Sequence, residues 1–220
     1  MIRARIEEEK FFDAIYPVSD DRIIIEAPHA GKPKSDIYTG FIGWELCSRY
    51  GWGGIISRTT RLLVDFNREA DYQRELRIYQ KEGIEARNAT LRKLAEKLKW
   101  NGSSPLLYLS LHGANTEKIN RLGGDFAAGT VYGETCPPEL RDAFTEKLSE
   151  ALKAGGAPHR GLKEAPAYSG HSSLKKLREL FGENFFIIQL ELSATLRKKF
   201  TDETISAIFL AVKGVLRELS

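Results

Sequence analysis

The sequence IIIEAPHAGKPKSD, residues 23–36, joins a run of isoleucines to a short polar loop. The isoleucines are typical of a buried β-strand, which would end near Pro28. His29 follows directly, and Asp36 lies seven residues further on. A strand with only a structural role does not require this end, so the stretch predicts a buried strand that leads into a functional loop.

Further strand-like runs alternate with helical patterns along the chain. We expect strands at 23–27, 54–58, 62–66, 106–111 and 185–190, and helices near 37–50, 71–99, 137–153, 172–181 and 202–219. This alternation predicts an α/β fold, a three-layer sandwich with a mostly parallel mixed sheet, formed as one domain over residues 1–220. The glycine-rich stretch 121–135 is expected to form a long functional loop or a small hairpin.

Composition is that of an ordinary soluble protein, with 42% hydrophobic and 29% charged residues. The net charge is only +3 and no basic block occurs, so we expect neither a nucleic-acid partner nor a membrane partner. Cys47 and Cys136 form no CxxC pair, which favours the cytoplasm over an oxidising compartment. One Met and three Gln among many Lys, Arg and Glu are typical of a thermophile. The oligomeric state stays open.

Polar side chains follow four of the expected strands. They are His29, the pair Asn67 and Arg68 after LLVDF, His112 after LLYLSL, and Glu191 after FFIIQL. Ligands of open α/β sheets bind outside the carboxyl ends of the strands. The sequence therefore predicts a site at that edge of the sheet.

Two histidines and a carboxylate are the minimal protein ligands of a catalytic zinc ion, because three ligands leave one position for water. His29 and His112 are the candidate imidazoles, and the acid is either Asp36 or Glu26. Side chains three residues apart in a strand point to opposite faces, which favours Asp36 over Glu26. Glu191 is the candidate base that takes a proton from the water.

The remaining candidates would bind substrate. The planar guanidinium of Arg68 suits a carboxylate, and Asn67 adds a neutral donor. In APAYSGHSS, residues 165–173, His171 lies on a glycine-preceded turn, and Tyr168 could donate to a developing oxyanion. Arg68 is the alternative catalytic residue for that role. We expect Arg197 on the protein surface.

Five ordered motifs resemble those of the N-formylglutamate amidohydrolase family, which is similar in fold to the zinc carboxypeptidases and the aspartoacylase group. They are PHAG, VDFNR, LSLHGAN, APAYSGHSS and IQLELSATLR, between about residues 23 and 200. The resemblance implies a phosphorylase/hydrolase-like fold that holds one zinc ion on His29, His112 and an acid after the first histidine, with Glu191 promoting water. Asn67 and Arg68 match the pair that grips the substrate carboxylate in aspartoacylase-like relatives. Ala30 replaces the usual serine, which leaves N-formylglutamate itself open as the substrate.

The prediction is a cytoplasmic zinc-dependent amidohydrolase that cleaves the linear amide of a small N-acyl amino acid. Two histidines and a carboxylate also suit non-haem iron, although the alternation of strands and helices disfavours that reading. The other alternative is a relative without turnover that binds a carboxylate ligand.

Overall fold

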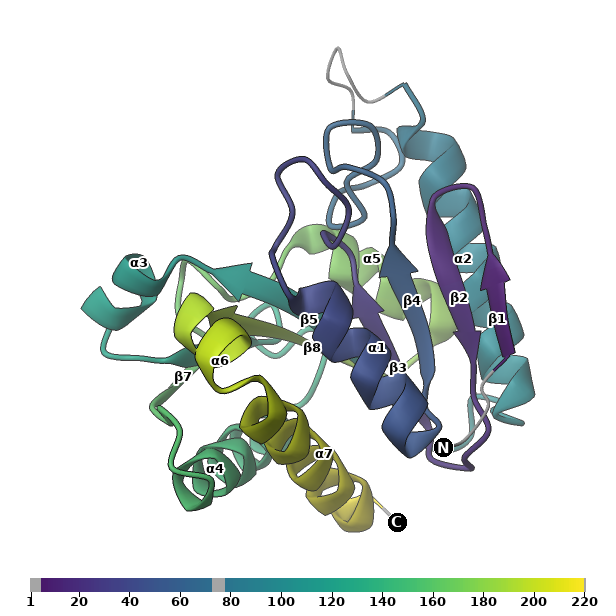
Figure 1. Cartoon of the computed structure of the whole chain (residues 1–220). Helices are drawn as coiled ribbons and strands as arrows, with labels where there is room; N and C mark the ends of the chain where they lie inside the picture. Colours follow the sequence, from purple (N-terminus) through teal and green to yellow (C-terminus); the bar gives the residue numbers. More distant parts are fainter. Residues whose placement is uncertain (1–4, 73–77, 220) are drawn as a thin grey trace.

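The computed structural model describes residues 5–72 and 78–219, which form an eight-stranded mixed sheet between two helical layers (Figure 1). The order of the strands is β1-β2-β4-β3-β5-β8-β6-β7, and four of the seven neighbouring pairs are parallel. The strands are β1 (Arg5–Glu8), β2 (Phe12–Tyr16), β3 (Ile23–Ala27), β4 (Gly53–Ser57), β5 (Leu106–Ala114), β6 (Phe126–Gly129), β7 (Gly161–Lys163) and β8 (Phe185–Ser193). The expected α/β class with a mixed sheet is confirmed.

Helices cover both faces of this sheet. The helices are α1 (Thr39–Tyr50), α2 (Gln80–Lys97), α3 (Thr116–Arg121), α4 (Pro138–Ala154), α5 (Ser172–Phe181), α6 (Ala194–Lys199) and α7 (Thr201–Glu218). Apolar side chains of α1, α4, α6 and α7 pack in one core on one face, whereas those of α2 and α5 pack in a second core on the other. None of the helices in the described ranges has both the length and the apolar character that a bilayer span requires.

The face toward α2 and α5 changes from apolar to polar along the central strands. On β5, Tyr108 packs in the core, and Ser110 and His112 follow it at alternate positions, which share a face. On β8, Gln189 and Glu191 are the register partners of Ser110 and His112. The carboxyl end of this face therefore carries buried polar groups over an apolar base.

The expected strand at 62–66 is wrong, because this segment forms turns. Val64 and Phe66 are buried in the core, and Val64 packs against α2 at Gly83. The side chain of Gln80 satisfies the backbone in place of a neighbouring strand: its Oε1 accepts from the Asp65 amide at 2.8 Å, and its Nε2 donates to the Asp65 carbonyl at 2.9 Å. The apolar run at 62–66 thus indicates burial of its side chains and not pairing as a strand.

Other elements differ from expectation in extent. The helix expected over 71–99 spans only 80–97, and residues 73–77 lie outside the described ranges. Strands β5 and β8 run three residues further than expected, so His112 and Glu191 lie within strands and not after them. The stretch 121–135 contains β6, and the short elements β1, β2, β7, α3 and α6 were not expected.

Candidate metal centre

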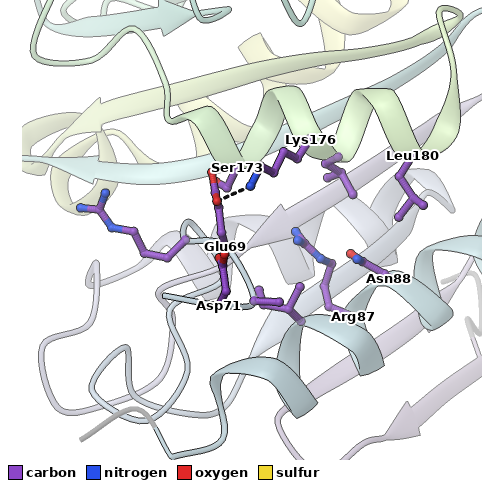
Figure 2. A pocket seen from close by; sticks show the side chains of 11 residues that line it. Glu69, Asp71, Arg87, Asn88, Ser173, Lys176 and Leu180 are labelled. Atoms are coloured by element: carbon purple, nitrogen blue, oxygen red, sulfur yellow. Dashed lines mark hydrogen bonds and ion pairs between the residues drawn. The ribbon is translucent and has the colours of Figure 1, made fainter. Parts of the chain in front are cut away.

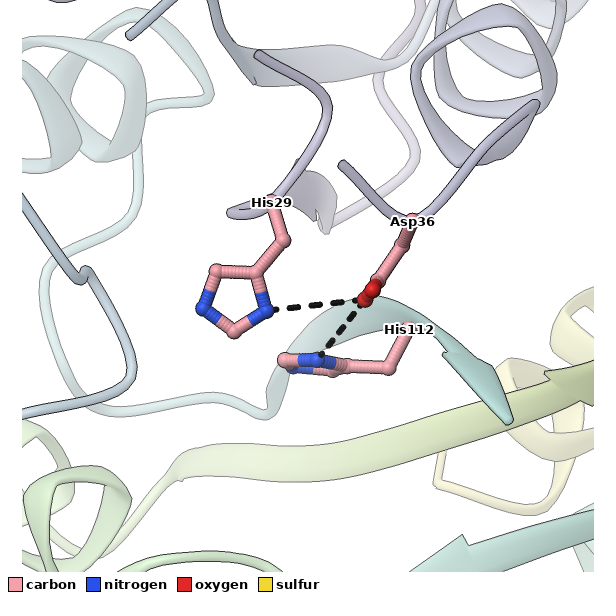
Figure 3. A group of neighbouring side chains, drawn as sticks. All are labelled: His29, Asp36 and His112. Carbon is pink, nitrogen blue, oxygen red and sulfur yellow. Dashed lines mark ion pairs between the residues drawn. The ribbon is translucent and has the colours of Figure 1, made fainter. Parts of the chain in front are cut away.

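Three predicted ligands converge at the carboxyl ends of β3 and β5, as Figure 3 shows. One ligand atom from each of His29, Asp36 and His112 lies within 4.8 Å of the other two. Asp36 Oδ2 is 3.5 Å from His29 Nδ1 and 3.6 Å from His112 Nδ1. These separations are long for good hydrogen bonds. They are close to the roughly 3.4 Å that separates neighbouring ligands around a tetrahedral zinc ion with ligand distances near 2.0–2.1 Å.

The polar loop brings Asp36 back to the histidine that precedes it. The backbone amide of Asp36 donates to the His29 carbonyl at 2.8 Å, which closes the loop. Asp36 Oδ2 accepts from the Gly113 amide at 3.0 Å, and Oδ1 pairs with Arg61 Nη2 at 3.1 Å. Burial alone would raise the pKa of Asp36, but the two imidazoles outweigh burial and hold it well below its usual range. Asp36 is therefore a fixed carboxylate.

Both imidazoles are oriented by partners on their far nitrogens. His29 Nε2 lies 2.8 Å from Asp65 Oδ1, and His112 Nε2 lies 3.1 Å from Ser110 Oγ. Each ring therefore presents Nδ1 to Asp36, and His29 Nδ1 is a buried atom without a hydrogen-bond partner among the described residues. Burial lowers the pKa of His29, but interactions with Asp36 and Asp65 outweigh it and raise the pKa overall. An orphaned imidazole nitrogen beside a carboxylate, with a second carboxylate behind the ring, fits a metal ligand.

Glu26 does not join this group. Its carboxylate lies 3.5 Å from Nη1 of Arg87 on α2, and both side chains are buried. The pair neutralises two charges under the polar face of the sheet. Of the two acids left open by the sequence, Asp36 is the one that the structure places beside the histidines.

Glu191 lies beside His112 on the neighbouring strand, in direct register. The side chain is buried, and Oε1 accepts from Gln189 Nε2 at 3.0 Å. Burial raises the pKa of Glu191, the nearby imidazoles oppose this, and the Asp36 charge adds to it, so the net shift is upward. A carboxyl group with a raised pKa beside a candidate metal cluster is suited to proton transfer.

The candidate substrate ligands lie on the α5 side of the cluster. Arg68 Nη1 contacts His171 Nε2, and His171 caps α5 through the amide of Ser173. Tyr168 is buried, and its hydroxyl has no hydrogen-bond partner within residues 5–72 and 78–219. Its pKa is raised by burial and by the charge of Glu191. The backbone amide of Asn67 donates to Asp65 Oδ1 at 3.1 Å, which ties the VDFNR turn to the carboxylate that holds His29.

A cavity of about 290 Å³ opens beside Arg68, between α2 and α5 (Figure 2). Glu69 lies on its wall, where it pairs with Lys176 and accepts from Ser172 Oγ at 3.2 Å. Apolar side chains form much of the remaining lining: Ala70, Ile84, Leu177 and Leu180. The cavity thus combines an apolar wall with charged residues, and Arg68 is among the residues that line it.

Arg197 is not on the surface as expected, because it is only 6% exposed. Three contacts of the site were not predicted from the sequence: Ser110 with His112, Gln189 with Glu191, and Arg61 with Asp36. The sequence could have predicted two of them, because alternate residues of a strand share a face. Ser110 lies two positions before His112 in LYLSLH, and Gln189 lies two positions before Glu191 in FIIQLE.

The sequence matches no model of a known protein family and no curated protein. Solved structures share the fold. An N-formylglutamate amidohydrolase from Ralstonia eutropha JMP134 matches with a TM-score of 0.69 at 16% identity, over 95% of this chain and 98% of that one. The expected resemblance to this fold is confirmed.

Two other solved structures are similar over nearly the whole chain. A bacteriophage poly-gamma-glutamate hydrolase matches with a TM-score of 0.53 at 14% identity, over 96% of this chain and 91% of that one. A metallo-carboxypeptidase from Burkholderia cenocepacia matches with a TM-score of 0.55 at 12% identity, over 99% of this chain and 65% of its own. At these identities the matches establish the fold, and the function has to be argued from the site.

Proposed function

We propose that this protein is a zinc-dependent amidohydrolase that cleaves the linear amide bond of a small N-acyl amino acid. The observation that carries the proposal is the spacing of His29, Asp36 and His112 beside the buried carboxyl group of Glu191. All three similar proteins named above are hydrolases by name, and one is a metallo-carboxypeptidase, which supports hydrolysis on this fold. The proposal places this activity in one domain over residues 1–220, in the cytoplasm, with a small molecule as its partner.

The three ligands would hold the ion through the Nδ1 atoms of His29 and His112 and an oxygen of Asp36. When bound, Zn²⁺ lowers the pKa of a water molecule and polarises the carbonyl group of an amide. Asp65 and Ser110 keep the imidazoles in the required orientation, since each occupies the far nitrogen of a ring.

Glu191 acts as the general base and then as the general acid. It accepts a proton from the attacking water and transfers it to the amine nitrogen that leaves when the C–N bond breaks. Its raised pKa favours this role, because a carboxylate with an ordinary pKa would be a weaker base and would accept the proton from water less readily. Tyr168, whose hydroxyl has no hydrogen-bond partner in the part of the chain that the structure describes, donates to the developing oxyanion.

Arg68 binds the carboxylate of the substrate, with His171 and Asn67 beside it. The side chain of Arg68 is 38% exposed and so remains accessible to a ligand. Its planar fork suits bidentate binding of a carboxylate. The cavity between α2 and α5 provides room next to this group for the side chain of the amino acid.

A panel of N-acyl amino acids, assayed with zinc-loaded protein, tests the proposal. We expect release of free amine from at least one member, and loss of at least a hundredfold in kcat for Glu191→Gln with zinc still bound. Glu179→Gln, an exposed change on α5, serves as the matched control and should retain full activity. If Glu191→Gln keeps most of the turnover, the proposed mechanism is wrong.

A further inference from the structure

Arg197 is a buried cation whose hydrogen bonds go to backbone carbonyls. Among the described residues, Nε donates to the carbonyl of Leu192 at 3.0 Å, Nη2 donates to that of Ala114 at 3.3 Å, and Nη1 contacts that of Ile37. Burial of a guanidinium is costly unless its donors are satisfied. Here three carbonyls from three separate segments satisfy it.

Each of these carbonyls lies within two residues of a member of the candidate site. Leu192 directly follows Glu191, Ile37 directly follows Asp36, and Ala114 lies two positions after His112. One side chain therefore joins the ends of β5 and β8 to the start of the segment that leads into α1. The fixed geometry of the guanidinium fork transmits this constraint, which a single ammonium group could not reproduce at three acceptors.

Gly113 lies between Arg197 and Asp36 and contacts both. A Cβ atom at position 113 would lie 2.7 Å from Arg197 Cζ, so the guanidinium packs on the backbone where only glycine leaves room. The amide of the same residue donates to Asp36 Oδ2 at 3.0 Å. Gly113 is thus held between the carboxylate and the guanidinium.

We propose that Arg197 is a positioning residue that fixes Asp36, His112 and Glu191 relative to one another, so that the metal ligands are assembled before an ion binds. The inference rests on the proposed metal centre and adds a residue that does not touch the ion or the substrate. Burial lowers the pKa of Arg197, and the nearby carboxylates of Asp36 and Glu191 oppose this shift only in part. Arg197 therefore contributes both geometry and compensating charge.

Two variants test the proposal by different routes. Arg197→Lys keeps the positive charge but loses the planar guanidinium. Gly113→Ala keeps the guanidinium, but the added Cβ atom displaces it. We expect each variant to bind Zn²⁺ about 10- to 100-fold more weakly, the range typical of lost outer contacts to a metal site. Arg141→Lys is the matched control, since Arg141 is 11% exposed but pairs with Asp142 and Glu164 on the α4 side of the molecule.

The measurements are the Kd for Zn²⁺, from chelator competition, and the visible absorption spectrum of the Co²⁺-loaded protein. A positioning role predicts weaker binding and an altered Co²⁺ spectrum in both variants, with no change in the control. A merely structural role predicts a lower urea midpoint with unchanged Kd and spectrum, which would overturn the inference. If Arg197→Lys does not fold, Gly113→Ala decides the matter alone. Failure of the wild-type protein to bind any ion would overturn the proposed function as well.

Discussion

Replacement of Asp65 by Asn tests the contribution of the carboxylate behind His29. Asp65 Oδ1 lies 2.8 Å from His29 Nε2, and the Asp65 side chain is 7% exposed, so the interaction is shielded from solvent. Asparagine has nearly the same shape but no charge, and its amide can present a donor where the carboxylate presents an acceptor. The variant should therefore change the basicity and tautomer of His29 with little change in packing.

The expected loss in affinity follows from this contact. Removal of an outer partner of a metal-binding histidine weakens binding by about 10- to 100-fold. This range corresponds to about 1.4–2.7 kcal/mol of binding free energy. Ser110→Ala removes the neutral hydroxyl behind His112, at 3.1 Å, and should cost less than tenfold because the lost partner carries no charge.

Chelator competition at pH 7 measures the zinc Kd of the wild type and both variants. We expect zinc to bind most tightly to the wild type, less tightly to Ser110→Ala and most weakly to Asp65→Asn. An Asp65→Asn protein that binds zinc as tightly as the wild type would show that the carboxylate does not support His29 as a ligand. A larger loss in Ser110→Ala than in Asp65→Asn would refute the argument from charge.

Three further outcomes follow from the structure. With metal removed by a chelator at pH 7, the free energy of unfolding of Glu191→Gln should exceed that of the wild type by about 1–2 kcal/mol, because the substitution removes a buried carboxyl group. Urea unfolding measures the difference. Because the pKa of Glu191 is raised in the folded protein, its contribution to stability is greatest below the unfolded pKa of 4.5 and is lost as the pH rises through the folded pKa. The stability advantage of Glu191→Gln should therefore shrink in acid. An advantage that does not change with pH would contradict this expectation. Arg68→Lys should raise KM at least tenfold with a smaller effect on kcat, and steady-state kinetics that show an unchanged KM would remove Arg68 from carboxylate binding. Glu26→Gln should leave zinc affinity within about threefold yet lower stability by about 3–5 kcal/mol, as urea unfolding would show, since it leaves Arg87 buried without its partner.

The sequence predicted the central strands because their apolar runs are long and bounded by polar residues. It failed at LLVDF, where burial of Val64 and Phe66 has the same apolar pattern as a strand, and where a distant residue, Gln80, satisfies the backbone. It also missed the edge strands β1 and β7, whose four and three residues carry no distinct pattern. Local sequence reports side-chain burial more directly than strand pairing.

Spacing within IIIEAPHAGKPKSD favoured Asp36 over Glu26, since the strand period turns Glu26 away from His29. The role of Arg197 could not be predicted, because an arginine in LRKKF has the same local sequence whether its side chain lies in solvent or donates to three carbonyls. Those acceptors come from residues 37, 114 and 192, and only folding brings them together.

The most direct test of the metal centre is elemental analysis of the protein purified without added metal, and again after zinc loading and dialysis. We expect about one zinc ion per chain after loading in the wild type, and loss of that ion in His112→Ala. Iron in place of zinc in the unloaded protein would replace the proposed cofactor, and a loaded wild type with no bound ion would contradict the account.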